Sequence, residues 1–285
     1  MDWLNIFTEP LAYDFMQRAL LVAVLVGAVS AVLSCFLVLK GWSLMGDAIS
    51  HAVLPGIVLA YVVGLPLAVG AFVAGLFSAV ATGYLKDNSR IKEDTAMGIV
   101  FTGMFAVGLV MFSRIETDQH LSHILFGDML GVTWGDLIET AVIAIGTLVV
   151  ILAKRRDFLL YTFDPQHARA IGLRVPLLHY GLLAMLSITI VASLQAVGII
   201  LVVAMLIAPG AIGFLLAKRF EAMLAIAMSV AIGSGVLGTL ISFSINGATG
   251  PCIVLIQTGV FILALLFAPG SGMLRRRGTM ERTTG

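Results

Sequence analysis

An acidic and an imidazole side chain lie four residues apart inside a highly apolar stretch of the sequence, the run Gly46 to Gly56. They are Asp47 and His51. On a helix this spacing places both side chains on one face, where they could share a ligand. Ionisable groups within a membrane span are costly and usually face a cavity or a substrate path, and a carboxylate with a neutral imidazole suits a divalent transition metal. We therefore expect a metal site; the alternative is a buried Asp–His hydrogen bond that fixes a helix break.

The amino-acid composition indicates the class of protein to which the chain belongs. Of the 285 residues, 60% are hydrophobic and 12% are charged, and the mean hydropathy is +1.06. Soluble domains carry about 25% charged residues. The sequence therefore predicts an all-α, polytopic membrane protein with little room for a soluble domain. A net charge of +1 gives no argument for nucleic-acid binding.

Nine apolar stretches approach the length of about 20 residues that a helix needs to cross a bilayer. We expect spans near 15–39, 44–63, 67–85, 95–112, 137–153, 177–195, 197–217, 222–245 and 252–269. Eight spans are the alternative, if 177–217 is miscounted or the first span is only partly inserted. Within the second span, Pro55-Gly56 predicts a kink or a break, because proline removes a backbone donor. Broken helices in transporters tend to lie at binding sites; a tolerated kink is the alternative.

The distribution of lysine and arginine in the short loops predicts the orientation. The basic loops are 86–92, 154–174, 218–219 and 275–277, and we place all of them in the cytoplasm. The loop 114–131 and the turn 246–251 then face the outside. This gives an extracytoplasmic segment 1–14, a membrane domain 15–270 and a basic cytoplasmic tail 271–285.

One cytoplasmic segment, about 157–175, differs from the spans around it. Asp164 suits a helix N-cap, Pro165 suits the first helical position, and Gly172 suits the residue just past the end. Ala168 and Ile171 would share a face of this helix. About eight residues are too few to cross a bilayer. The helix therefore either lies at the membrane interface or docks a partner.

Several sequence motifs of catalysis are missing. The sequence contains neither a Gly-x-x-x-x-Gly-Lys-Ser/Thr phosphate loop nor a His-Glu-x-x-His zinc motif. We therefore do not expect this chain to be an enzyme. An acid–imidazole pair in a span and a capped cytoplasmic helix together suggest a substrate path and a place where an external motor could push.

Four stretches of the sequence resemble one family, the metal-type permeases of bacterial ABC importers. The run Leu44 to Gly56 closely resembles the signature of that family. The stretches 15–20, 164–172 and 197–211 resemble its opening, its cytoplasmic segment and its late glycine-to-proline span. The resemblance covers about residues 15–270.

The resemblance implies a permease subunit in the bacterial cytoplasmic (inner) membrane that moves manganese, iron or zinc into the cytoplasm and holds no permanent cofactor. It implies that Asp47 and His51 are ligands on the metal path, with the break at Pro55 and Gly56 nearby. Residues 164–172 become the coupling helix, in which we single out Asp164, Pro165, Ala168, Ile171 and Gly172.

The resemblance also implies partners. These are cytoplasmic ATP-binding subunits, an extracytoplasmic metal-binding protein, and a second permease that is either the same or a different chain.

Two other functions are the rival hypotheses. One rival hypothesis is a secondary metal carrier driven by an ion gradient. The other is a metal-dependent membrane enzyme, for which the second span lacks a third strong ligand and a base.

Overall fold

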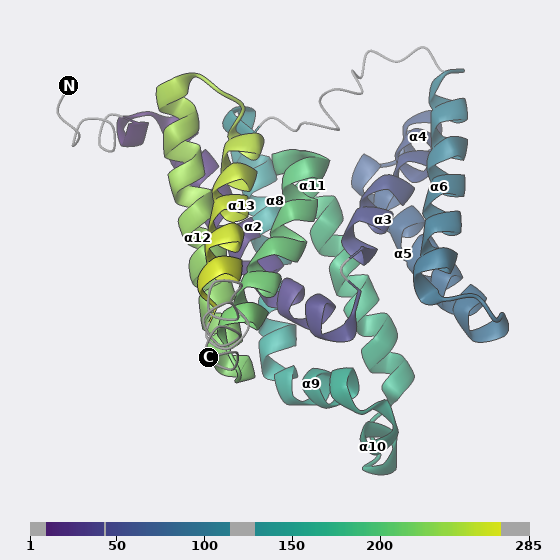
Figure 1. Cartoon of the computed structure of the whole chain (residues 1–285). Helices are drawn as coiled ribbons and strands as arrows, with labels where there is room; N and C mark the ends of the chain where they lie inside the picture. The colour runs from purple at the N-terminus through teal and green to yellow at the C-terminus, as the bar shows by residue number, and fades with distance from the viewer. Residues whose placement is uncertain (1–9, 43, 115–128, 269–285) are drawn as a thin grey trace, which may run out of the picture.

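The computed structural model describes residues 10–42, 44–114 and 129–268, and every regular element in these residues is a helix (Figure 1). The long helices are α2 (Asp14–Lys40), α5 (Leu67–Asn88), α6 (Glu93–Phe112), α8 (Trp134–Ala153), α11 (Val175–Leu216), α12 (Phe220–Ile245) and α13 (Thr249–Phe267). The short ones are η1 (Pro10–Ala12), α3 (Met45–Ala52), α4 (Leu54–Val63), η2 (Met129–Gly131), α9 (Arg155–Phe163) and α10 (Pro165–Ala170). The predicted all-α fold is confirmed.

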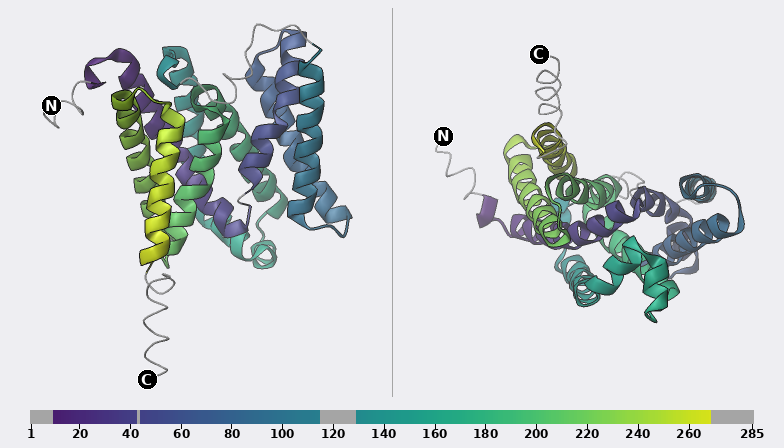
Figure 2. Two further views of the ribbon diagram at one scale, coloured as in Figure 1. Left: turned by 45° about the horizontal axis from the view of Figure 1, so that its top comes forward. Right: turned by 60° about the horizontal axis from the view of Figure 1, so that its bottom comes forward.

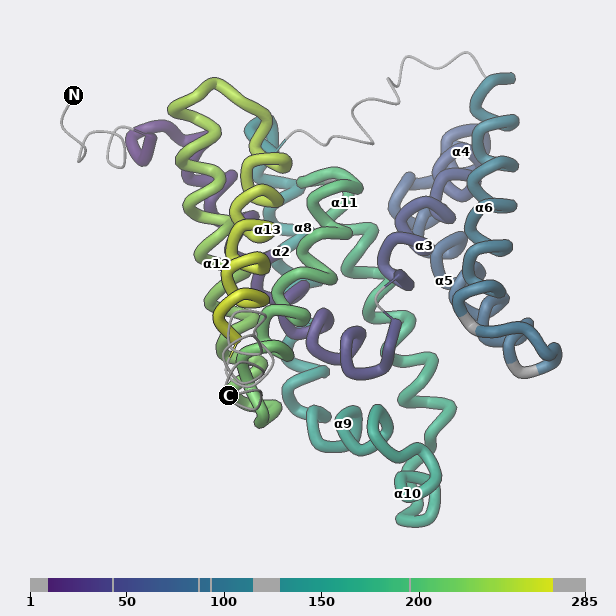
Figure 3. The backbone as a smooth tube through the Cα atoms, in the orientation of Figure 1, coloured from purple at the N-terminus to yellow at the C-terminus, as the bar shows by residue number. Residues whose placement is uncertain are grey.

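Within these ranges, nine helical stretches are long and apolar enough to cross a membrane, as predicted. Helices α3 and α4 together make one of them, and α11 supplies two, Val175–Leu194 and Ala196–Leu216. The helix is interrupted at Gly198, near the start of the second stretch, where φ is 78° and ψ is 166°. This conformation lies in the region that favours glycine, so the chain changes direction there without a loop, and the two halves can be followed in Figure 3.

Helix α2 lies at the centre of the larger group of helices, and it is the most deeply buried of the nine stretches. It packs against α8, α11 and α12. The smaller group consists of α3 to α6, and α11 joins the two groups through its contacts with α3 and α5 (Figure 2). The expected metal pair therefore belongs to the smaller group.

Helices α4 and α5 meet along a seam of small residues. A Cβ atom on Gly56 would lie 2.1 Å from the carbonyl oxygen of Gly70, and a Cβ on Gly70 would lie equally close to that of Gly56. Ala60 and Ala74 continue the seam. The Ala74 Cβ would lie 2.6 Å from a Cβ on Gly56, and the Ala60 Cβ would lie 2.6 Å from a Cβ on Gly70. Small residues at this spacing let membrane helices approach closely. Gly56 is thus needed for helix packing, besides its place after Pro55.

The seam predicts that Gly70→Ala destabilises the protein. The added methyl group would overlap the backbone of α4, and overpacking of this kind costs about 1–3 kcal/mol. Gly98→Ala is the matched control, because nothing lies within 4 Å of a Cβ at that helical position. Thermal unfolding of the purified protein in detergent should show a lower midpoint for Gly70→Ala alone. Equal midpoints for the two variants would contradict the seam.

A serine of α2 bonds to the backbone of α11 next to a proline. Pro209 cannot donate a backbone hydrogen bond, and it stands within the second half of α11. The Ser34 hydroxyl accepts a hydrogen bond from the Gly210 N–H at 2.9 Å and donates one to the Ile207 carbonyl at 3.2 Å. This fixes α11 against α2 beside the proline.

Candidate metal-binding site and cytoplasmic helix

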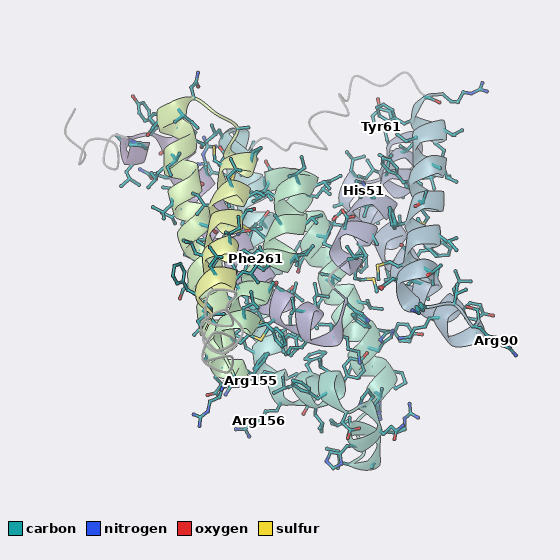
Figure 4. The ribbon with its side chains drawn as sticks, viewed as in Figure 1. His51, Tyr61, Arg90, Arg155, Arg156 and Phe261 are labelled. Atoms are coloured by element: carbon teal, nitrogen blue, oxygen red, sulfur yellow. The ribbon has the colours of Figure 1, made fainter. Side chains whose placement is uncertain are left out.

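Asp47 and His51 both lie on α3, as the spacing predicts. His51 Nε2 is 3.4 Å from Asp47 Oδ1. The other positions of α3 are mostly buried: Met45, Gly46, Ala48, Ile49, Ser50 and Ala52. The side chains of His51 and Asp47 are in contrast 28% and 37% exposed. The pair therefore occupies the one open side of an otherwise buried helix (Figure 4 labels His51).

The His51 ring is oriented by two aromatic residues of α6. The Phe105 ring meets it edge-on with the centroids 5.1 Å apart, and the Phe101 ring is tilted at 6.2 Å. Nδ1 of His51 is buried and has no hydrogen-bond partner among the described residues. Nε2, next to Asp47, is therefore the nitrogen that can reach a metal together with the carboxylate.

The two donors do not complete a metal site by themselves. No group of three or more His, Cys, Asp or Glu side chains able to hold a metal occurs in the part of the chain that the structure describes. Divalent transition metals take four or more ligands. The described residues therefore supply two protein donors here, and further ligands would come from water, from another chain or from residues outside the described ranges.

The second span is interrupted slightly before Pro55-Gly56, where the sequence predicted a kink or a break. Helix α3 ends at Ala52 and α4 begins at Leu54, so the interruption is at Val53. The reason is that Pro55 lacks the N–H that would bond to the His51 carbonyl, and its ring crowds that carbonyl. Val53 keeps helical angles, φ −74° and ψ −19°. The interruption is therefore local, directly after the histidine.

Helix α10 has the caps predicted from its sequence. Asp164 Oδ1 accepts hydrogen bonds from the N–H groups of Gln166, at 3.1 Å, and His167, at 2.9 Å. Pro165 is the first helical residue. Gly172 follows the end of the helix with φ +88°. The local chemistry of the segment therefore sets where this short helix begins and ends.

Ala168 and Ile171, which are predicted to share a face of this helix, differ in burial. Ala168 is fully buried in a cluster with Tyr161 and Val175, whereas Ile171 is 58% exposed. Ile171 caps the end of α10, where its N–H still bonds to the His167 carbonyl at 3.1 Å. Ala168 thus anchors the segment to the membrane domain, and Ile171 is left on the surface.

A cluster of aromatic side chains and one lysine joins α9 and α11 to the end of α2 and the residues that follow it. The Tyr161 hydroxyl and His179 Nδ1 are hydrogen-bonded at 2.8 Å. The Trp42 ring stands edge-on to the His179 ring with the centroids 5.2 Å apart, and Lys40 Nζ lies 4.1 Å from the centre of the Tyr161 ring. These residues were not predicted from the sequence, because they are far apart in the chain and come together only where α2, α9 and α11 pack.

Known proteins resemble this chain over nearly its whole length. The model of the ABC 3 transport family matches residues 12–268. The chelated iron transport system membrane protein YfeD of Yersinia pestis is 66% identical over 263 residues, covering 92% of this chain and 89% of that protein. The manganese transport system membrane protein MntB of Synechocystis sp. is 52% identical over 266 residues, covering 93% and 87%.

A solved structure has the same fold. It is that of PsaBC from Streptococcus pneumoniae in complex with Fab, with a TM-score of 0.86 and 38% sequence identity. The match covers 96% of this chain and 99% of that one. The chain therefore belongs to the ABC 3 transport family, the ABC transporter permeases to which its signature stretch pointed.

Proposed function

We propose that this chain is the membrane permease of an ATP-binding-cassette importer that carries manganese or iron into the cytoplasm, with zinc compatible with the same donors. Family membership and the names of two relatives, a chelated iron and a manganese transport system membrane protein, support the transport class. The observation that carries the proposal for this chain is the Asp47–His51 pair. Its oxygen and nitrogen lie 3.4 Å apart on the open side of a membrane helix.

A second permease, identical or paralogous, would complete the site. Two chains would bring two such pairs to a shared passage, giving up to four protein ligands. One pair alone would bind a metal too weakly to select it, and a rigid closed cage would release it too slowly. Transport needs binding that is favourable at entry and still reversible. An extracytoplasmic metal-binding protein would deliver the ion, so the metal is cargo and not a resident cofactor.

The segment 157–175 would couple the permease to its motor. ATP hydrolysis would take place on separate cytoplasmic ATP-binding subunits, and α10 would contact them through its exposed end. Asp164, Pro165 and Gly172 set the geometry of this end, Ala168 anchors it, and Ile171 is available for contact. The hydrogen bond between Tyr161 and His179 links this segment directly to α11.

The orientation is also a proposal. Figure 4 shows Arg90, Arg155 and Arg156 at one end of the molecule, the end at which α9 and α10 lie in Figure 1. Basic residues accumulate on the cytoplasmic side, which supports a cytoplasmic α10. The C-terminal tail 271–285 and most of the segment 1–14 lie outside the described residues. A reporter fused to the C-terminal end should give a cytoplasmic signal, and an extracytoplasmic signal would overturn this orientation.

Reconstitution tests the function directly. The chain should move manganese into proteoliposomes only when its ATP-binding subunits and ATP are present. A secondary carrier would instead transport the metal alone, driven by an ion gradient without ATP. Uptake by this chain alone under a proton or sodium gradient would therefore contradict the importer.

A further inference from the structure

A basic cavity that the proposed metal path does not use lies where α9 and α12 begin. Its volume is about 400 Å³. It is lined by Arg155, Arg156 and Leu159 of α9 and by Arg219, Phe220 and Glu221 at the start of α12. Three guanidinium groups therefore converge from two segments that are more than sixty positions apart in the chain.

The charges around this cavity are unbalanced. Arg155 Nη2 and Glu221 Oε1 form an ion pair at 3.5 Å, with side chains 42% and 80% exposed. Such an exposed pair is weak. Arg156 and Arg219 have no acidic partner among the described residues, and Lys218 adds a further positive charge next to Arg219. The cavity therefore keeps a net positive charge that favours an anion.

The cavity lies at the level where two spans leave the bilayer. Arg155 follows the last residue of α8 by only two positions, and Arg219 directly precedes the first residue of α12. The apolar part of the lining is fixed, because the Phe220 ring packs on Phe36 of α2 with the centroids 5.2 Å apart. Arginine groups at this depth meet the phosphates of lipid headgroups.

The helix that leads to the cavity, α8, has exposed apolar side chains near its end. The last turns of α8, just before Arg155, expose three apolar side chains, Val149, Val150 and Leu152, by 40% to 61%. The α12 helix starts at Phe220 without a capping side chain, so its first N–H groups add to the attraction for an anion. A ligand with a phosphate at one end and hydrocarbon at the other fits both surfaces.

We propose that this cavity binds the headgroup of an anionic phospholipid from the cytoplasmic leaflet. Arg156 and Arg219 hold the phosphate, as planar guanidinium groups do well, and the acyl chains lie along the exposed apolar side chains of α8. The lipid thereby tethers α9, which carries the proposed coupling helix, to the membrane surface. The inference rests on the proposed orientation and not on metal transport.

Lipid titration of the purified, delipidated full-length chain tests the site. Native mass spectrometry should show one phosphatidylglycerol bound per chain in preference to phosphatidylcholine. The variant Arg156→Gln/Arg219→Gln should weaken this binding at least tenfold. The matched control Arg90→Gln/Lys92→Gln removes the same charge from exposed positions between α5 and α6, and it should bind like the unmodified chain.

Three other outcomes of these experiments would contradict the proposed lipid site. Equal binding of phosphatidylcholine by the unmodified chain would overturn the proposal, even if the double variant failed to fold. Displacement of phosphatidylglycerol by millimolar inorganic phosphate would show that the ligand is free phosphate and not a lipid. Unchanged lipid binding in Arg156→Gln/Arg219→Gln, together with loss of the ATP-binding subunits on purification, would assign the arginines to that partner instead.

Discussion

Asp47→Asn is expected to abolish metal uptake while the permease stays folded. The amide keeps an oxygen that can accept a hydrogen bond from His51, but it loses the negative charge that a divalent metal needs. We expect a loss of about a hundredfold, the upper end of what removing even a supporting group costs a metal site. Radioactive manganese or iron uptake by cells that express equal amounts of each variant measures it.

The same substitution separates metal binding from a structural role. If Asp47 and His51 only fix the end of α3, the amide should preserve that function and uptake should remain near normal. His51→Ala should lose uptake as completely as Asp47→Asn. Ser50→Ala is the control from the same helix, because the Ser50 hydroxyl bonds within α3, to the Gly46 carbonyl at 2.8 Å. It should retain most of the uptake.

Ile171→Glu is expected to uncouple the permease from ATP hydrolysis. Ile171 is 58% exposed at the end of α10 and supports no buried cluster, so a charge there should leave the membrane domain intact. At a docked surface the same charge would be desolvated without a partner, which is costly. We expect loss of the ATP-binding subunits on co-purification and a fall in ATP-driven uptake of at least tenfold.

A matched isoleucine controls this experiment. Ile91 lies in the basic loop between α5 and α6 and is 38% exposed. Ile91→Glu introduces the same charge and should leave both readouts unchanged. Gly172→Pro is the stronger disruption, because proline cannot adopt the φ of +88° found there. Normal co-purification and uptake in both Ile171→Glu and Gly172→Pro would rule out α10 as the coupling helix.

The parts of the fold that depend on local chemistry were predictable from sequence. The bilayer imposes a length and an apolar composition on each span, so the number of spans followed from hydropathy. The caps of α10 followed from Asp164, Pro165 and Gly172, which act on their own neighbours. Helix α8 begins at Trp134, earlier than the predicted 137, because Thr133 and Asp136 form a capping box that was not recognised.

The parts that depend on distant partners were not predictable. Gly56 and Gly70 stand among many glycines, and only the pairing of α4 with α5 shows that these two must be small. Ser34 carries no sign that it bonds to α11, 176 positions away at Gly210. For the proposed metal pair, helical spacing predicted the approach of Asp47 to His51, but not the two phenylalanines of α6 that contact the ring.

The most direct measurement of metal ligation is pulsed electron paramagnetic resonance of Mn²⁺ bound to the assembled transporter. Coordination by His51 Nε2 predicts nitrogen coupling to the manganese that changes when histidine is labelled with ¹⁵N. The coupling should disappear in His51→Ala and persist in Ser50→Ala. A manganese signal without nitrogen coupling, or one that His51→Ala leaves unchanged, would contradict the proposal that this imidazole binds the transported metal.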